Sequence, residues 1–90
     1  MKKFIIERDI PSIGTMDQIA LQAAAAQSCD ALNRIGPKIQ WLESFVAGNK
    51  TFCVYLAEDK ALIRQHAEFS GFPANQVTEI LNTISPLTAG

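Results

Sequence analysis

The sequence predicts an α+β fold of the ferredoxin-like type, in which a four-stranded antiparallel sheet carries two helices on one face. The first observation is that β-prone segments occupy residues 3–9, 39–47, 51–57 and 77–84. The second is that residues 15–35 and 59–70 repeat apolar residues at helical spacing. These segments alternate in the order β-α-β-β-α-β, and right-handed connections then place both helices on the same face.

The signals at the ends of the expected helices support this order. Thr15 and Gln18 fit a capping box for the first helix, and Gly36 followed by Pro37 ends it. Its apolar stripe is rich in alanine and therefore thin, which predicts that the helix lies close to the sheet. The stripe consists of Leu21, Ala24, Ala25, Ser28, Ala31, Leu32 and Ile35.

The second helix is expected to begin after Asp59 as N-cap and to end at Gly71. The residues expected on its inner side are Leu62, Ile63, His66, Ala67 and Phe69. We expect residues 1–84 to form a single ferredoxin-like domain and residues 85–90 to form a C-terminal tail.

Strand alternation decides which side chains face the helices and which lie on the opposite, open face of the sheet. In segment 51–57 the more apolar set is Phe52, Val54 and Leu56, so this set is assigned to the helix side. Cys53 and Tyr55 then lie on the open face. The same alternation places Ile5 and Glu7 of the first strand there, together with Val77, Glu79 and Leu81 of the last.

The second strand depends on the length of the turn that contains Gly48 and Asn49. A three-residue turn places Trp41, Glu43 and Phe45 on the open face, whereas a two-residue turn buries them under the helices. We prefer the three-residue turn because burying an unpaired carboxylate is costly.

Composition excludes several classes of function. The net charge is −1 and the eight basic residues are scattered, so the pattern of a nucleic-acid-binding protein is missing. No apolar stretch reaches the length of a membrane span, and the apolar run after Lys2-Lys3 is too short for a signal peptide. Cys29 and Cys53 form no C-x-x-C pair, which indicates free thiols. A cytoplasmic protein is therefore expected.

The predicted open face combines apolar and acidic side chains, and a wide apolar patch is not expected to stay in contact with water on a monomer. We therefore expect a homodimer in which two sheets stack as a dimeric α/β-barrel assembly. The side chains assigned to this ligand or interface face are Trp41, Phe45, Cys53 and Tyr55, with Glu7, Glu43 and Glu79 among them.

Four segments carry a family resemblance. They are Glu7-Arg8, residues 40–46 (QWLESFV), residues 50–55 (KTFCVY), and residues 63–67 (IRQHA) followed by GFPA at 71–74. In this order and spacing the chain resembles a small bacterial ferredoxin-like family of unknown function that includes a nickel-binding protein. The resemblance implies a homodimer and offers binding or sequestration of nickel, or of another divalent metal, as a function.

The candidate metal ligands are three carboxylates and the only imidazole of the chain: Glu7, Glu43, Glu79 and His66. A histidine titrates near neutral pH and suits nickel or zinc, although a partly buried helix histidine needs no function. The alternative function resembles a cofactor-free enzyme or small-molecule binder of the monooxygenase or isomerase type. In that alternative a cavity between sheet and helices holds an organic molecule, and His66, Tyr55 or a carboxylate transfers a proton. No reaction follows from the sequence.

Overall fold

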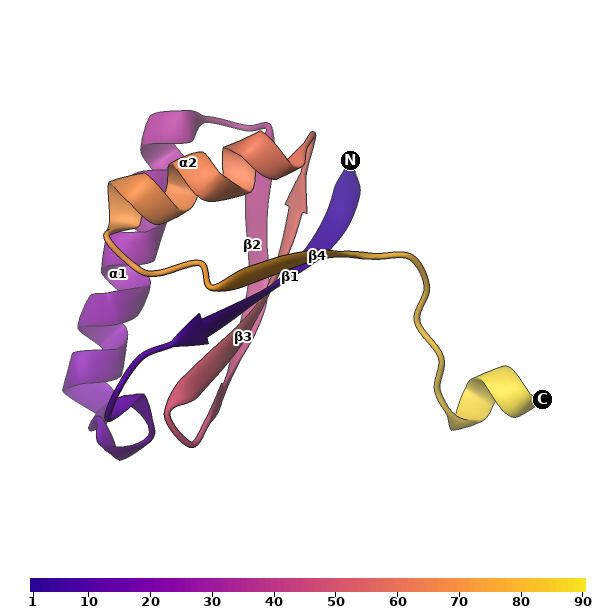
Figure 1. The fold of residues 1–90 in the computed structure, drawn as a ribbon, viewed down its shortest axis with the longest axis horizontal. Helices are drawn as coiled ribbons and strands as arrows, with labels where there is room; N and C mark the ends of the chain where they lie inside the picture. The colour runs from indigo at the N-terminus through magenta and orange to yellow at the C-terminus, as the bar shows by residue number, and fades with distance from the viewer.

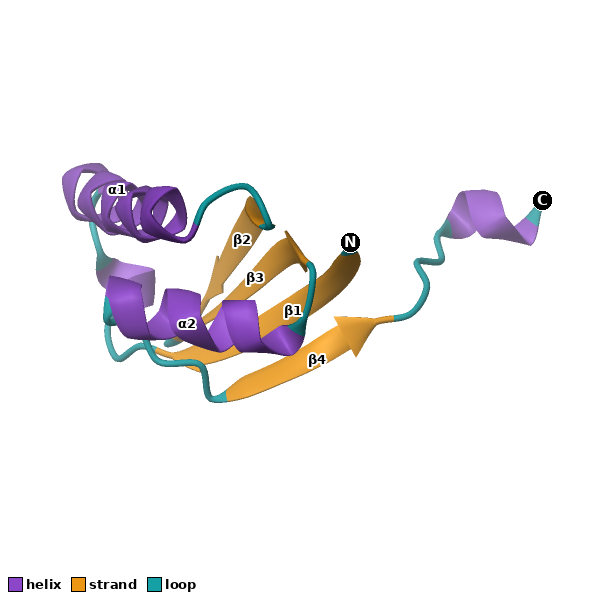
Figure 2. Ribbon diagram, turned by 90° about the horizontal axis from the view of Figure 1, so that it is seen from above, coloured by secondary structure: helices purple, strands orange, loops and turns teal.

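A four-stranded antiparallel sheet carries both long helices on one of its faces (Figures 1 and 2). The computed structural model describes residues 1–90. Its elements are β1 (Lys2–Asp9), α1 (Gln18–Ile35), β2 (Ile39–Ala47), β3 (Lys50–Ala57), α2 (Lys60–Ser70) and β4 (Gln76–Ile80). The strand order is β2-β3-β1-β4, so the predicted β-α-β-β-α-β arrangement is confirmed. No helix has both the length and the apolar character needed to cross a membrane.

Both helices begin at an aspartate. The Asp17 carboxylate accepts a hydrogen bond of 2.8 Å from the amide of Ala20, so the predicted cap at Thr15 was wrong. The Thr15 hydroxyl donates instead to the carbonyl of Ser12, within the 3-10 turn η1 (Ile13–Thr15). In α2 the predicted cap is confirmed, because Asp59 accepts from the amide of Leu62 at 3.1 Å.

The predicted stop of α2 is also confirmed, since Gly71 adopts a left-handed conformation with φ of 76°. Its inner side differs from the prediction at one position. Phe69 is exposed, and Ser70 is buried in its place beside Ile63 and His66.

The predicted faces of β3 were wrong. Cys53 and Tyr55 are buried beneath the helices, whereas the side chains of Phe52, Val54 and Leu56 lie on the open face. The pairing with β1 explains the reversal, because Tyr55 lies opposite the core residue Phe4 and Cys53 lies opposite Ile6. The more apolar set of β3 is not the buried one, because a tyrosine can be buried when its hydroxyl finds hydrogen-bond partners.

The hairpin between β2 and β3 closes with two residues, Gly48 and Asn49, not with three. A β-bulge between Trp41 and Glu43 then changes the face along β2. Trp41 pairs with Tyr55 on the helix side, so its predicted place on the open face was wrong. Glu43 pairs with Val54, and beyond it Phe45 pairs with Phe52, so both side chains lie on the open face as predicted.

β4 ends at Ile80, four residues before the predicted end of the strand. Val77 is buried opposite Ile6 on the helix side, which corrects the assignment of Val77 and Glu79 to the open face. Beyond β4 the chain leaves the body of the molecule and ends in a short 3-10 helix, η2 (Pro86–Ala89) (Figure 2). Three apolar side chains on this arm are 80–90% exposed: Leu81, Ile84 and Leu87.

The loop between β1 and α1 is fastened to the β2–β3 turn. The amide of Ile10 donates to the carbonyl of Asn49 at 2.9 Å, and that of Ser12 to the Asn49 side chain at 3.3 Å. Gly14 comes so close to the turn that an added Cβ would lie 2.3 Å from the carbonyl oxygen of Gly48. Only glycine fits this approach.

We therefore expect Gly14→Ala to lower the free energy of unfolding by about 1–3 kcal/mol, because the clash is with backbone that cannot turn aside. Urea denaturation measures the change. The control is Gln22→Ala on the exposed side of α1, which should leave the free energy of unfolding nearly unchanged. A Gly14→Ala protein as stable as the control would contradict the close approach.

Candidate functional site

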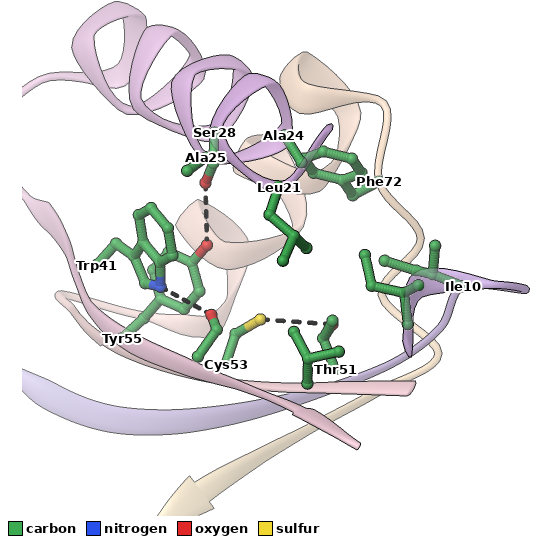
Figure 3. A pocket seen from close by; sticks show the side chains of 13 residues that line it. Ile10, Leu21, Ala24, Ala25, Ser28, Trp41, Thr51, Cys53, Tyr55 and Phe72 are labelled. Carbon is green, nitrogen blue, oxygen red and sulfur yellow. Dashed lines mark hydrogen bonds between the residues drawn. The ribbon is translucent and has the colours of Figure 1, made fainter. Parts of the chain in front are cut away.

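A cavity of about 220 Å³ lies between α1 and the sheet (Figure 3). The small side chains of Ala24 and Ala25 form its roof, so the thin stripe of α1 leaves a space where close contact with the sheet was predicted. Ten of the thirteen lining residues are hydrophobic, which makes the cavity predominantly apolar. The lining residues are Ile10, Ile13, Leu21, Ala24, Ala25, Ser28, Trp41, Ser44, Val46, Thr51, Cys53, Tyr55 and Phe72.

One wall of the cavity is aromatic. The rings of Trp41 and Tyr55 lie 6.5 Å apart between centroids, at 21° between their planes. The Trp41 indole donates a hydrogen bond of 2.9 Å to the hydroxyl of Ser44, so its polar atom is satisfied within the strand (Figure 3). The indole is therefore held in place as part of a preformed apolar surface.

A cluster of three polar side chains joins the sheet to both helices at one end of the cavity. The Tyr55 hydroxyl lies 2.9 Å from Nε2 of His66 on α2 and 3.4 Å from the hydroxyl of Ser28 on α1. Ser28 Oγ is also 3.2 Å from His66 Nε2. Ser28 and Tyr55 line the cavity, whereas His66 is 0% exposed and lies behind them.

Burial sets the protonation states of this cluster. It lowers the pKa of His66 from 6.5 to about 4, and the nearby positive charge of Arg8 acts in the same direction. Burial also raises the pKa of the Tyr55 hydroxyl above its usual value of 10. At neutral pH the cluster therefore consists of a neutral imidazole and two neutral hydroxyls, with Nδ1 of His66 left without a partner.

Arg8 is the one charged residue buried beneath the helices, with 2% of its surface exposed. Its guanidinium carbon lies 5.9 Å from the ring centroid of Tyr55 and 6.0 Å from that of Phe72. Nε and Nη2 have no hydrogen-bond partner. Cation–π contacts stabilise the charge only partly, since a buried ion normally needs a hydrogen-bonded counter-ion.

The structure separates the predicted ligand or interface residues into two groups. Trp41, Cys53 and Tyr55 line the cavity on the helix side, while Phe45 is 54% exposed on the open face. The three cavity residues therefore belong to a different surface from the one to which the sequence assigned them. For Cys53 and Tyr55 the reason is the reversed face of β3, and for Trp41 it is the two-residue turn and the bulge of β2.

The predicted metal ligands do not meet within one chain. Glu7 and Glu43 lie on the open face but on strands separated by β3, and Glu79 lies opposite Phe4 on the other face. His66 is enclosed, with Nε2 near Tyr55 and Ser28. No group of three or more histidine, cysteine, aspartate or glutamate side chains is placed to hold a metal ion.

Sequence reasoning named neither Arg8 nor Ser28 as a site residue. A signal for Arg8 was present, because it continues the alternation Phe4, Ile6, Arg8 of the buried set of β1. A charge in phase with core residues is unusual, since arginine is almost never fully buried unless it is paired. Ser28 carried the same kind of signal as the polar member of the apolar stripe of α1.

The fold and the cavity define a small ferredoxin-like α+β protein with an interior pocket between helix and sheet. The chain matches the SCO4226-like family, described as nickel responsive proteins, over residues 4–80, and it belongs to that family. The crystal structure of SCO4226 from Streptomyces coelicolor A3(2) has the same fold, with a TM-score of 0.71 at 15% identity over 91% of this chain and 99% of that one. No curated protein matches the chain.

The depressed pKa of His66 predicts a loss of stability in acid. The unfolded chain binds a proton at this imidazole near pH 6.5, whereas the folded protein binds it only near pH 4. The neutral state of His66 therefore contributes fully to stability above about pH 6.5, and this contribution is lost as the pH falls toward 4. We expect the free energy of unfolding to fall by about 2 kcal/mol between pH 7.5 and pH 5.

NMR measures the titration directly, because His66 is the only histidine. We expect its ring proton signals to stay constant from pH 8 to about pH 5.5 and to shift with a midpoint near 4. Urea unfolding at pH 7.5 and pH 5 measures the loss of stability. A midpoint near 6.5 would show that the imidazole is open to water.

Proposed function

We propose that the protein is a homodimer that binds nickel, or another divalent metal, with carboxylates of the open face. Membership of a family described as nickel responsive supports the choice of metal. The main structural support is that two carboxylates lie on a largely apolar sheet face that no element of the same chain covers. Figure 2 shows both helices on the opposite side of the sheet.

The open face has the composition of a surface that a second copy covers. Phe45 is exposed there, and Phe52, Val54 and Leu56 lie beside it along β3 at intermediate exposure. Ile5 continues the same patch onto β1 opposite Val54. A contiguous apolar area on a sheet face is typical of a protein interface, and stacking against its own copy is the symmetric solution.

The metal site of this proposal requires both copies. Within one chain Glu7 and Glu43 are two strand spacings apart across the sheet and two residues apart along it, about 12 Å in all, which is too far to bind the same ion. Glu7 is also held by Lys50, whose Nζ lies 2.6 Å from its carboxylate. A two-fold axis through the open face brings a second pair of carboxylates to the first, so metal binding depends on dimerisation.

The dimer is tested by placing a charge at the centre of the open face. We expect Val54→Lys to weaken self-association by at least about a hundredfold, because the interface would bury an unpaired ammonium group. Sedimentation equilibrium measures the mass, with Gln65→Lys on the exposed side of α2 as the matched control. Equal masses for both variants at every concentration would contradict this interface.

Nickel binding is tested by calorimetry on tag-free protein. We expect Glu43→Gln to weaken nickel binding by about tenfold or more, since it removes the negative charge and keeps the size of the side chain. Glu68→Gln on the exposed surface of α2 should bind nickel like the unaltered protein. The absence of nickel-dependent heat in the unaltered protein would remove the metal-binding function.

The cavity favours a second candidate function, the binding of a small organic molecule. It is predominantly apolar and has two hydroxyls, Ser28 and Tyr55, at one end. Apolar cavities with a few convergent polar groups are the usual form of small-molecule sites. Because the cavity lies on the opposite side of the sheet from the carboxylates, this function does not depend on metal binding.

A further inference from the structure

The buried guanidinium of Arg8 has no counter-ion. The ion pairs of the chain are those of Lys50 with Glu7 and with Asp9, and neither involves Arg8. Arginine is effectively always charged in proteins, so the side chain of Arg8 is a buried charge that needs partners. Leaving it unpaired inside the protein costs free energy, and an anion that reached Nε and Nη2 would recover part of that cost.

The guanidinium lies beside the cavity between helix α1 and the sheet but is not among the side chains that line it. The two rings that flank it, Tyr55 and Phe72, both line the cavity. Arg8 also lies directly opposite Thr51, a third lining residue, in the pairing of β1 with β3. Phe72 lies on the connection between α2 and β4, outside any helix or strand, and is half-buried, so it can turn aside more readily than a core residue.

The cavity limits the size and the shape of its occupant. A volume of about 220 Å³ is below the roughly 300–1,000 Å³ of pockets that hold drug-sized ligands. The nearly parallel rings of Trp41 and Tyr55 offer a flat apolar wall. The fitting molecule therefore has one ring or a short branched chain, and one polar group at the end where Tyr55 and Ser28 lie.

We propose that the cavity binds a small apolar monocarboxylate, whose carboxylate pairs with Arg8 and whose apolar body packs against Trp41. This inference rests on the second candidate function, small-molecule binding, and adds the charge class of the ligand. A carboxylate matches the planar fork of a guanidinium and accepts two parallel hydrogen bonds from it.

The test uses Trp41 as the reporter, because it is the only tryptophan and lines the cavity. Phenylacetate and its uncharged isostere phenylacetamide are titrated into the full-length protein while the indole fluorescence is recorded. We expect saturable binding of phenylacetate that is about ten- to a hundredfold tighter than that of the amide, the ratio for a charge-assisted hydrogen-bonded pair.

Two variants assign the preference to Arg8. Arg8→Met keeps an unbranched apolar stem but removes the guanidinium, so it should make the two probes bind equally. Arg64→Met on the exposed side of α2 should keep the preference for the acid. Because Arg8→Met removes an unpaired buried charge, thermal unfolding should show a stability at least equal to that of the unaltered protein. If Arg8→Met does not fold, the comparison of acid and amide on the unaltered protein still decides the question.

The other outcomes overturn the inference in distinguishable ways. Equal binding of acid and amide to the unaltered protein would overturn the charge class and leave small-molecule binding standing. A preference for the acid that survives Arg8→Met would place the anion at another residue. No fluorescence change with either probe, and none in a thermal-shift assay, would overturn both the inference and the candidate function on which it rests.

Discussion

The inward direction of Tyr55 is the constraint on which the rest of the structure depends. Its ring belongs to the core, and its hydroxyl lies within hydrogen-bond distance of His66 on α2 and near Ser28 on α1. One side chain of the sheet therefore contacts a polar group on each helix. An unpaired buried hydroxyl is costly, so these contacts also specify how both helices sit on the sheet.

The same constraint fixes the two faces of β3. With Tyr55 inward, Phe52, Val54 and Leu56 must point to the open face, because successive side chains alternate. β2 follows only in part, since the bulge at Leu42 lets Trp41 face inward while Glu43 and Phe45 face outward. A regular strand would place Trp41 and Glu43 on the same face. The bulge lets Trp41 pack against the core while the Glu43 carboxylate stays in contact with water.

The features that could be predicted from the sequence are those set by residues close together in the chain. The order of elements, the cap at Asp59 and the stop at Gly71 follow from residues close together in the chain, and the structure confirms them. The face of β3 is not a local property, because the competing set Phe52, Val54 and Leu56 is more apolar than the set that is buried. The pairing of β3 with the core residues of β1 and the hydrogen-bond partners of Tyr55 on the two helices decide between the two sets.

The candidate site was predicted only in part, for a related reason: Trp41, Cys53 and Tyr55 were named but assigned to the open face, and Arg8 and Ser28 were not named. Sequence reasoning looked for acids and for the single histidine, whereas the unusual feature is an arginine in phase with the core residues of β1. The alternative function included a cavity between sheet and helices, but the sequence does not decide whether one exists. A stripe of small residues such as Ala24 and Ala25 fits either a helix that touches the sheet or a helix that leaves a space. Packing of the larger residues at the two ends of α1 decides between these, and no local pattern reports it.

The two proposed functions share one strand and use its opposite sides. Cys53 and Tyr55 of β3 face the cavity, and Val54 and Leu56, which alternate with them, form the centre of the proposed dimer surface. A second copy that presses on the open face therefore contacts the strand that holds the wall of the cavity. Because β3 lies between β1 and β2 with pairing along its whole length, it cannot shift without moving Arg8 and Trp41. Glu7 and Arg8 are neighbours on β1, and Trp41 and Glu43 lie two residues apart on β2, so β1 and β2 also connect the proposed metal-binding face to the pocket.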